Sequence, residues 1–205
     1  MKHMALEIIL ASSSPRRSML LREAGYRFQV VPSAANELEA TAEDVHDIVV
    51  ENARIKGSAV LARLADQPLA VRTPPTRNIL LAADTLVVKG QRVYGKPRDL
   101  DEAESFLHEL GGVPHEVLTG VFLYDLDHGR QRAFWDTTSV VLKKMDSAEI
   151  RRLFARVTPL DKAGGYGFQD AREIVAEMHG DETNVIGLPM IRTKHHLEAL
   201  LQQDD

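Results

Sequence analysis

Residues 79–88 read ILLAADTLVV, an almost continuous apolar run that contains a single charged residue, Asp84. A short apolar run of this kind is typical of a central β-strand. A turn around Gly90 and the segment 92–96 follow it, so the region is predicted to form a β-hairpin.

Strands and helices are mixed along the rest of the chain. Further strands are predicted at residues 6–11, 28–31, 116–124, 133–142 and 174–178. Helices are predicted from Ser14 to Gly25, from Thr41 to about residue 65, from Asp99 to Gly111, from Ser147 to about residue 157, and over residues 190–201. The proline-containing segment 66–78 is predicted to be a loop. Because strands and helices do not alternate strictly, the pattern predicts an α/β or α+β fold with a mixed sheet, and not a doubly wound Rossmann fold.

Length and composition limit the classes of protein to consider. The 205 residues suit one domain, or two closely packed halves, over residues 1–205. Thirty acidic against 25 basic residues give a net charge of −5, which argues against a duplex nucleic acid partner. The absence of cysteine excludes disulfides, thiolate catalysis and zinc–thiolate sites. No apolar run approaches the ~20 residues of a membrane span and no signal peptide is recognisable, so we expect a cytoplasmic protein without membrane association.

Residues 12–17 read SSSPRR and place Arg16 and Arg17 in the first turn of a predicted helix. Cations there oppose the helix macrodipole, whose positive end is at the N-terminus. A bound polyanion would turn this cost into a gain, because arginine side chains and the N–H groups of a helix N-terminus both bind phosphate. The alternative is a capped surface helix whose arginines are solvated.

Asp84 interrupts the apolar run at a position where a buried carboxylate is normally a metal ligand, a catalytic base or half of an ion pair. If the hairpin turns at Gly90, Lys96 lies across from Asp84, close enough to share a site for an anion and a metal. Two alternatives are open. The strand could end at Ala83, with Asp84 in a bend, or Lys96 could form a simple cross-strand salt bridge.

Lys56 lies in a helical stripe that includes Val45, Val49 and Val60, where an ammonium group is out of place. The alternative is a lysine at the edge of the stripe that extends its charge to solvent. Asn52, one turn earlier, shows that the stripe is not purely apolar.

A carboxylate and several cations in a net acidic protein indicate a triphosphate held by cationic side chains, with Asp84 serving a metal and a water molecule. In phosphoryl chemistry, cations neutralise the charge that develops on the leaving group, while a carboxylate orients and deprotonates water. The sequence has neither the glycine–lysine motif of a P-loop nor the Gly-x-Ser-x-Gly elbow of the α/β-hydrolases.

Five motifs occur in order: LASSSPRR (10–17), NARIK (52–56), ADT (83–85) with GKP (95–97), DKAGGYGFQ (161–169) and NVIGLP (184–189). Together they resemble the motifs of the Maf family of nucleoside triphosphate pyrophosphatases, which is related in fold to the inosine triphosphate pyrophosphatases. The likeness covers nearly the whole chain. It implies a mixed, twisted β-sheet flanked by helices, with two lobes around a central cleft. Two departures are Gly57 and Gly165, which replace alanines usual in the family.

The resemblance also implies an activity and the residues that carry it out. The activity is metal-dependent hydrolysis of a nucleoside triphosphate to a nucleoside monophosphate and pyrophosphate, with Mg²⁺ or Mn²⁺ as cofactor. The resemblance also implies a homodimer. Asp84 matches the catalytic carboxylate, described as the proton acceptor, and Glu37 matches an acidic residue that helps Asp84 to hold the metal. The phosphate-binding polar residues are matched by Ser12, Arg17, Lys56 and Lys96.

Base specificity in the family follows three positions, which here are Arg16, Thr85 and Gln169. This set resembles the subgroup that acts on dTTP and UTP. The Gln169 amide can both donate to and accept from the O4–N3 edge of a pyrimidine. Two other functions stay open: a nucleotide-binding regulator of cell division and septum formation without catalysis, and a phosphomonoesterase.

Overall fold

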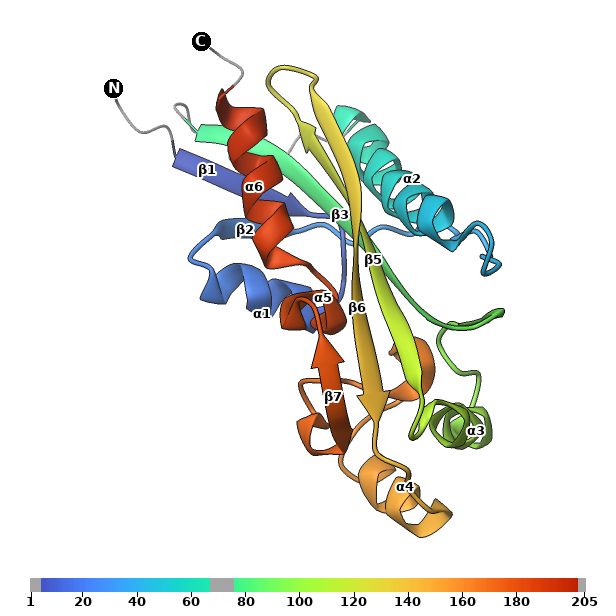
Figure 1. The fold of residues 1–205 in the computed structure, drawn as a ribbon. Coiled ribbons are helices and arrows are strands. Elements are labelled where there is room, and N and C mark those ends of the chain that lie inside the picture. Colours follow the sequence, from blue (N-terminus) through green and yellow to red (C-terminus); the bar gives the residue numbers. More distant parts are fainter. Residues whose placement is uncertain (1–4, 67–75, 203–205) are drawn as a thin grey trace.

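Seven strands in the described part of the chain form one twisted sheet (Figure 1). The computed structural model describes residues 5–66 and 76–202. The strands are β1 (Ala5–Leu10), β2 (Arg27–Val30), β3 (Thr76–Lys89), β4 (Arg92–Tyr94), β5 (Pro114–Asp125), β6 (Gln131–Leu142) and β7 (Val175–His179). Their order is β2-β1-β3-β5-β6-β7, and β4 pairs with β3 outside this path.

Parallel and antiparallel pairs both occur in the sheet. Strand β1 runs parallel to β2 and β3, whereas the pairs β3–β5, β5–β6 and β6–β7 are antiparallel and β4 forms an antiparallel hairpin with β3. The predicted fold class, a mixed α/β structure with a mixed sheet flanked by helices, is therefore confirmed.

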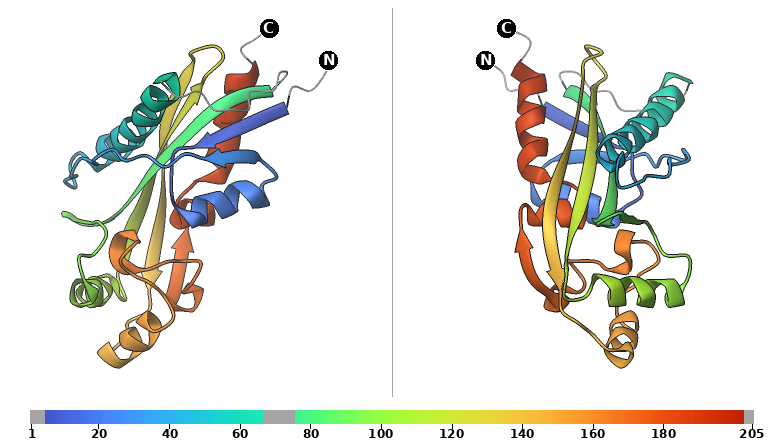
Figure 2. Two further views of the ribbon diagram at one scale, coloured as in Figure 1. Left: turned by 180° about the vertical axis from the view of Figure 1, so that it is seen from behind. Right: turned by 45° about the vertical axis from the view of Figure 1, so that its right-hand side comes forward.

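Helices cover both faces of the sheet, because neighbouring residues of its central strands point to opposite sides. The helices are α1 (Pro15–Glu23), α2 (Val45–Asp66), α3 (Leu100–Leu110), α4 (Ser147–Phe154), α5 (Glu182–Ile186) and α6 (Met190–Leu201). Ile79 and Leu81 of β3 pack in the cluster with α1 and α6, whereas Leu80 and Ala82 pack in the cluster with α2. Figure 2 shows α2 and α6 on opposite sides of the long strands.

The long strands β5 and β6 extend past α2 and α6 to a further apolar core (Figure 1). That core joins them to α3, α4 and the segment around Tyr166. The same strands therefore support apolar clusters at both ends of the molecule. No helix in residues 5–66 or 76–202 has both the length and the apolar character needed to cross a bilayer.

Several predicted boundaries were wrong. Helix α2 begins at Val45 and not at Thr41, because the Asp44 carboxylate accepts a hydrogen bond from the Thr41 N–H (2.7 Å) and closes a turn ahead of the helix. In the predicted loop 66–78, residue 66 ends α2 and residues 76–78 pair with β1, while 67–75 lie outside the described residues. Helix α4 ends at Phe154, short of residue 157. Helix α5 was not predicted, because five residues are too few to show a helical period.

Candidate functional site

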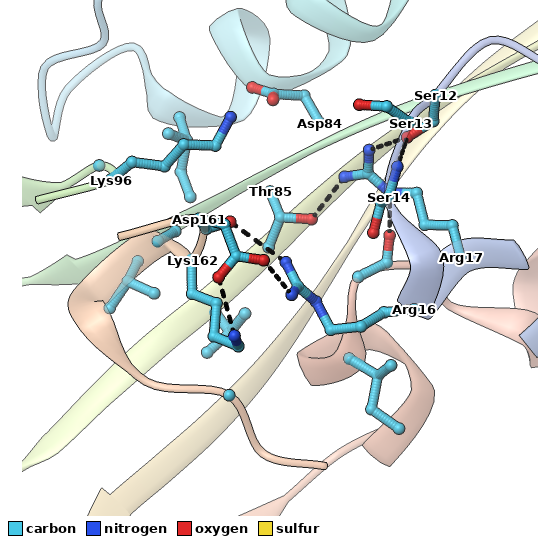
Figure 3. A pocket seen from close by; sticks show the side chains of 18 of the residues that line it. Ser12, Ser13, Ser14, Arg16, Arg17, Asp84, Thr85, Lys96, Asp161 and Lys162 are labelled. Atoms are coloured by element: carbon cyan, nitrogen blue, oxygen red, sulfur yellow. Dashed lines mark hydrogen bonds and ion pairs between the residues drawn. The ribbon is translucent and has the colours of Figure 1, made fainter. Parts of the chain in front are cut away.

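A cavity of about 480 Å³ opens where the apolar clusters meet. Its lining comes from segments far apart in the sequence: the end of β1 and start of α1, the segment 33–37, the middle of α2, β3, the segment after β4, Val117 of β5, the loop 161–168, and residues 185–187. Figure 3 shows charged side chains from these segments converging on one space. The polar residues that the sequence singled out and that line this cavity are Ser12, Arg16, Arg17, Glu37, Lys56, Asp84, Thr85 and Lys96.

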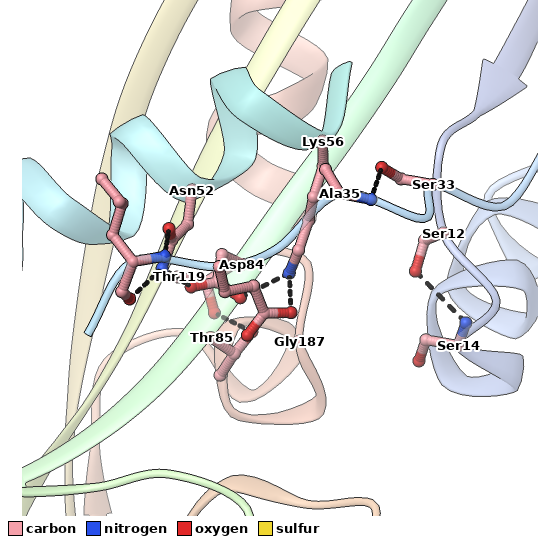
Figure 4. Close-up of polar contacts among 12 residues, drawn as sticks. Ser12, Ser14, Ser33, Ala35, Asn52, Lys56, Asp84, Thr85, Thr119 and Gly187 are labelled. Carbon is pink, nitrogen blue, oxygen red and sulfur yellow. Dashed lines mark hydrogen bonds and ion pairs between the residues drawn. The ribbon is translucent and has the colours of Figure 1, made fainter. Parts of the chain in front are cut away.

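Asp84 is buried within β3 and faces α2, so the alternative that the strand ends at Ala83 is wrong. Its Oδ1 accepts a hydrogen bond from Lys56 Nζ (2.6 Å), and its Oδ2 accepts one from Asn52 Nδ2 (3.1 Å) (Figure 4). Lys56 Nζ also lies 2.7 Å from Glu37 Oε1, so one ammonium group bridges two carboxylates. Lys56, which interrupts the apolar stripe of α2, therefore faces inward and is paired with carboxylates.

Glu37 and Asp84 differ in exposure although they share Lys56. The Glu37 side chain is 40% exposed, whereas that of Asp84 is 5% exposed. Burial raises the pKa of Glu37, but its hydrogen bond to Lys56 and the charges of Lys56, Lys96 and Arg17 together lower that pKa below its ordinary value. Glu37 therefore stays ionised at the mouth of the cavity at neutral pH.

Two glycines let α2 approach the sheet closely enough for these contacts. Gly120 of β5 pairs with Asp84 of β3, and a Cβ atom added to Gly120 would lie 2.2 Å from the carbonyl oxygen of Val49. A Cβ atom on Gly57 would lie 2.5 Å from the Phe122 ring. Since neither position has room for a side chain, the backbone of α2 packs against β5 at a short distance and brings Lys56 to Asp84.

Arg17 is buried at the start of α1 and its guanidinium contacts three segments. Nε donates to the Gly187 carbonyl oxygen (2.8 Å), one terminal nitrogen to Ser12 Oγ (3.1 Å) and the other to Thr85 Oγ1 (3.1 Å). Burial lowers the pKa of Arg17 and the nearby Asp84 charge raises it; an arginine remains protonated in either case. The alternative of solvated arginines is therefore wrong for Arg17.

Arg16 points to the loop 161–168 on the other side of the cavity (Figure 3). It donates to Asp161 Oδ2 (2.8 Å) and to the Asp161 carbonyl oxygen (3.2 Å). Lys162 Nζ donates to Asp161 Oδ1 (2.8 Å) and to the Thr158 carbonyl oxygen (2.6 Å). Burial raises the pKa of Asp161, but the hydrogen bonds and charges of Lys162 and Arg16 lower it overall. The carboxylate thus joins the two cations into one cluster.

Two residues lie elsewhere than the sequence predicted. The β3–β4 pairing ends at Val87 and Tyr94, so Lys96 has no strand partner across from Asp84. It lines the cavity from the segment after β4, and no ion pair joins it to Asp84 among the described residues. Gln169 is exposed and does not line the cavity; its amide nitrogen contacts Met19 Sδ.

The sequence analysis missed the contacts that Asn52, Asp161 and Lys162 make at the site. Asn52 also holds the Glu37 segment, because its Oδ1 accepts from the Leu38 N–H (2.7 Å) and its Nδ2 donates to the Leu38 carbonyl oxygen (3.1 Å). Its position one turn before Lys56 was a usable signal. Asp161 and Lys162 were visible only as part of a motif.

A known protein family and several individual proteins are similar to this chain over most of its length. The family model described as "Maf-like protein" matches residues 7–200. The chain belongs to the Maf family. A Geobacter sp. (strain M21) relative named "dTTP/UTP pyrophosphatase" is 40% identical over 194 residues, which cover 94% of this chain and 95% of the relative. Relatives with the same name from Agathobacter rectalis and Bacillus cereus are 36% and 38% identical, over 95% and 94% of this chain and 97% and 89% of the relatives.

The motifs that define the resemblance to the Maf family meet in one place. Segments 10–17, 52–56, 83–85, 95–97, 161–168 and 185–187 each contribute at least one residue to the cavity. A family likeness over residues 7–200 thus coincides with one polar cavity.

Proposed function

We propose that this member of the Maf family hydrolyses nucleoside triphosphates, with dTTP and UTP preferred, and releases a nucleoside monophosphate and pyrophosphate. The observation that carries the proposal is the buried Asp84 carboxylate in a cavity that also contains Arg16, Arg17, Lys56, Lys96 and Lys162. Cations on several sides suit a polyphosphate, and a carboxylate among them suits a reaction that must remove a proton from water. The names of the relatives support the pyrimidine preference.

In the proposed reaction, a water oxygen attacks the α-phosphorus and the bond from that phosphorus to the α–β bridging oxygen breaks. Asp84 takes the proton of the attacking water, and pyrophosphate leaves with the bridging oxygen. Arg17, Lys56 and Lys96 neutralise the charge that develops on the leaving group, with Ser12 as a further phosphate contact. Arg17 is held in place before the substrate arrives, because three protein acceptors already bind it.

The carboxylates present fit a divalent cation such as Mg²⁺ or Mn²⁺. Asp84 and Glu37 both lie within 2.7 Å of the same ammonium group, so two carboxylates already face one cationic position. Among the described residues no cluster of three or more acidic, histidine or cysteine ligands exists. A Mg²⁺ ion is commonly held by one or two carboxylates together with substrate phosphates. The ion would neutralise phosphate charge and polarise the reacting phosphoryl group.

Base selection is assigned to Arg16, Thr85 and Gln169. Arg16 and Thr85 line the cavity, on the side opposite Lys56 and next to Arg17. Gln169 follows the loop that lines the cavity and would have to leave Met19 to reach a base. That the protein is cytoplasmic and forms a homodimer are further predictions.

The test is a nucleotide panel with identification of the products. The purified chain is incubated with Mg²⁺ or Mn²⁺ and each nucleoside triphosphate, and the products are separated by ion-exchange chromatography. We expect monophosphate and pyrophosphate in equal amounts, with dTTP and UTP ahead of the purine nucleotides. Release of single phosphates would instead identify a phosphomonoesterase. Nucleotide binding without any product would leave a non-catalytic regulator as the function.

A further inference from the structure

A fully buried threonine lies directly behind the cavity. Thr119 of β5 pairs with Thr85 of β3, and the two hydroxyl oxygens are 3.0 Å apart. Thr119 Oγ1 also lies 3.1 Å from the carbonyl oxygen of Asn184, at α5. Thr85 lines the cavity and Thr119 does not, so any effect of Thr119 on a ligand must pass through the residues that Thr119 holds (Figure 4).

The proton count fixes the direction of each hydrogen bond. A hydroxyl group has one proton, and a carbonyl oxygen can only accept. Thr119 therefore donates its proton to Asn184, which leaves its oxygen to accept the proton of Thr85. Since the proton of Thr85 is then used, the Thr85 oxygen presents a lone pair to Arg17, whose guanidinium can only donate.

The same hydrogen bonds close a ring around Arg17. The Asn184 carbonyl oxygen that accepts from Thr119 also accepts from the Gly187 N–H (3.0 Å), and the Gly187 carbonyl oxygen accepts from Arg17 Nε (2.8 Å). The Asn184 side chain is fixed in turn, because its Nδ2 donates to the Val117 carbonyl oxygen (2.9 Å). The turn from Asn184 to Gly187 and the two threonines thus hold Arg17 from two sides.

An arginine has five N–H donors, and Gly187, Ser12 and Thr85 use three of those on Arg17 in the described part of the chain. Two donors, one on each terminal nitrogen, are left for phosphate oxygens. The direction of these two N–H groups depends on the orientation of the guanidinium plane. Thr85 helps to fix that orientation, because it accepts from one of the two terminal nitrogens.

We infer that Thr119 is a positioning residue, which directs the Thr85 hydroxyl so that it accepts from Arg17 and thereby aims the free Arg17 donors at a phosphate group. The inference rests on the proposed function for the identity of the ligand. It predicts that removal of the Thr119 hydroxyl weakens phosphate binding although Thr119 touches no ligand.

The test uses Thr119→Val, which keeps the shape of the side chain and removes the hydroxyl. The Asn184 carbonyl oxygen keeps its bond from Gly187, so this variant leaves no buried carbonyl without a partner. The probe is inorganic pyrophosphate with Mg²⁺, and its dissociation constant is measured by calorimetry. We expect an increase of about tenfold for Thr119→Val, because a misdirected Arg17 then loses about one charged hydrogen bond to the pyrophosphate. Thr119→Ser, which restores the hydroxyl, is expected to bind as the wild type does.

Two further variants separate positioning from a general structural effect. Thr85→Val breaks the same chain of bonds from the cavity side, and Thr119→Val added to it is expected to cause no further loss. Thr193→Val is the matched control: Thr193 is another fully buried threonine, on α6, with no partner for its hydroxyl among the described residues. It is expected to bind pyrophosphate as the wild type does.

Unchanged pyrophosphate binding in Thr119→Val would overturn the inference, and so would a full additional loss in the double variant. If Thr119→Val does not fold, Thr119→Ala takes its place, because it also removes the hydroxyl and must show the same tenfold loss. Turnover is measured separately as KM and kcat for dTTP. A wild type that binds pyrophosphate in a Thr119-dependent way but releases none from dTTP would reject the proposed function and leave the inference intact.

Discussion

Two walls of the cavity are built from different kinds of structure. The helix wall consists of Lys56 of α2 and Asp84 of β3, and Asn52 of α2 supports it through its bond to Asp84. The loop wall consists of residues 161–168, which contain a short 3-10 turn at Ala163–Gly165 and otherwise no regular structure. Each wall contributes charged side chains to the same space.

The walls are also held in different ways. The helix wall is fixed by close backbone packing at Gly120, and this packing does not depend on side-chain charge. The loop wall is fixed by side-chain bonds, chiefly the one between Tyr166 and His115 Nε2 (2.7 Å) and the one between Asp161 and Arg16. A reacting group needs an accurately held position, whereas a selecting group has to adapt to the ligand. We therefore expect chemistry to depend on the helix wall and base selection on the loop wall.

The largest effect is expected from Asp84→Asn, which removes the basic group from the helix wall. The substitution keeps the volume of the side chain and the acceptor for Lys56, so the fold is expected to stay intact. Loss of a general base typically costs about 10²–10⁴-fold in rate, and we expect kcat for dTTP to fall by about 10³-fold. Circular dichroism and pyrophosphate release measure the two properties. Normal pyrophosphate release by the folded variant would reject the role of Asp84.

Gly120→Ala is expected to disturb the packing of the helix wall without changing its charged groups. The new methyl group would meet the Val49 backbone, which cannot rotate away as a side chain can. Overpacking of this kind costs about 3 kcal/mol of the free energy of unfolding. Urea denaturation measures the loss. Gly95→Ala is the matched control, because a Cβ atom there meets nothing within 4 Å and its φ is not left-handed. Equal stability of the two variants would show that close approach of α2 is not required.

A fall in pH is expected to lower the free energy of unfolding through His115, whose Nε2 bonds to Tyr166 of the loop wall. Burial lowers the pKa of His115 to about 4, from an ordinary value of 6.5. Between these values the unfolded chain binds the proton and the folded chain does not, so the free energy of unfolding falls as pH falls. From pH 7.5 to pH 5 the loss is about 2 kcal/mol.

The measurement is urea denaturation of the wild type and His115→Gln at pH 7.5 and pH 5. The variant has no imidazole at this position, so its stability is expected to change less by about 2 kcal/mol over the same interval. Other groups with shifted pKa, such as His196, are present in both proteins and cancel in the comparison. Parallel loss of stability in the two proteins would show that His115 is not protonated on unfolding.

The difference between the walls also explains what could be predicted from sequence. Asp84 and Lys56 belong to a long strand and a long helix, so polar residues in apolar patterns revealed them without knowledge of the fold. The mixed sheet followed from the same patterns. The β3–β5 register that pairs Thr85 with Thr119 is set by tertiary structure, and no local signal marks a buried threonine.

The residues of the loop wall show no helical or strand periodicity from which their structure could be predicted. Its chain direction depends on Gly164 and Gly165, whose positive φ values only glycine adopts readily. The contact between Arg16 and Asp161 joins residues 145 positions apart, so neither residue predicts the other. Lys96 was placed wrongly because the strand pairing stops two residues earlier, where Gly95 and Pro97 flank it.

The smallest effect is expected from Gln169→Ala, which tests whether the loop wall selects the base. Gln169 now contacts Met19, outside the cavity, so its role requires the end of the loop to move when a nucleotide binds. One hydrogen bond to a pyrimidine edge contributes about 1 kcal/mol, which corresponds to about a fivefold loss of preference for UTP over GTP. The loss is expected in KM, with kcat preserved, because the helix wall is unchanged. Met19→Leu frees Gln169 without altering it and is expected to keep the preference. An unchanged UTP to GTP ratio in Gln169→Ala would assign selection to Arg16 and Thr85, the two predicted residues that already line the cavity.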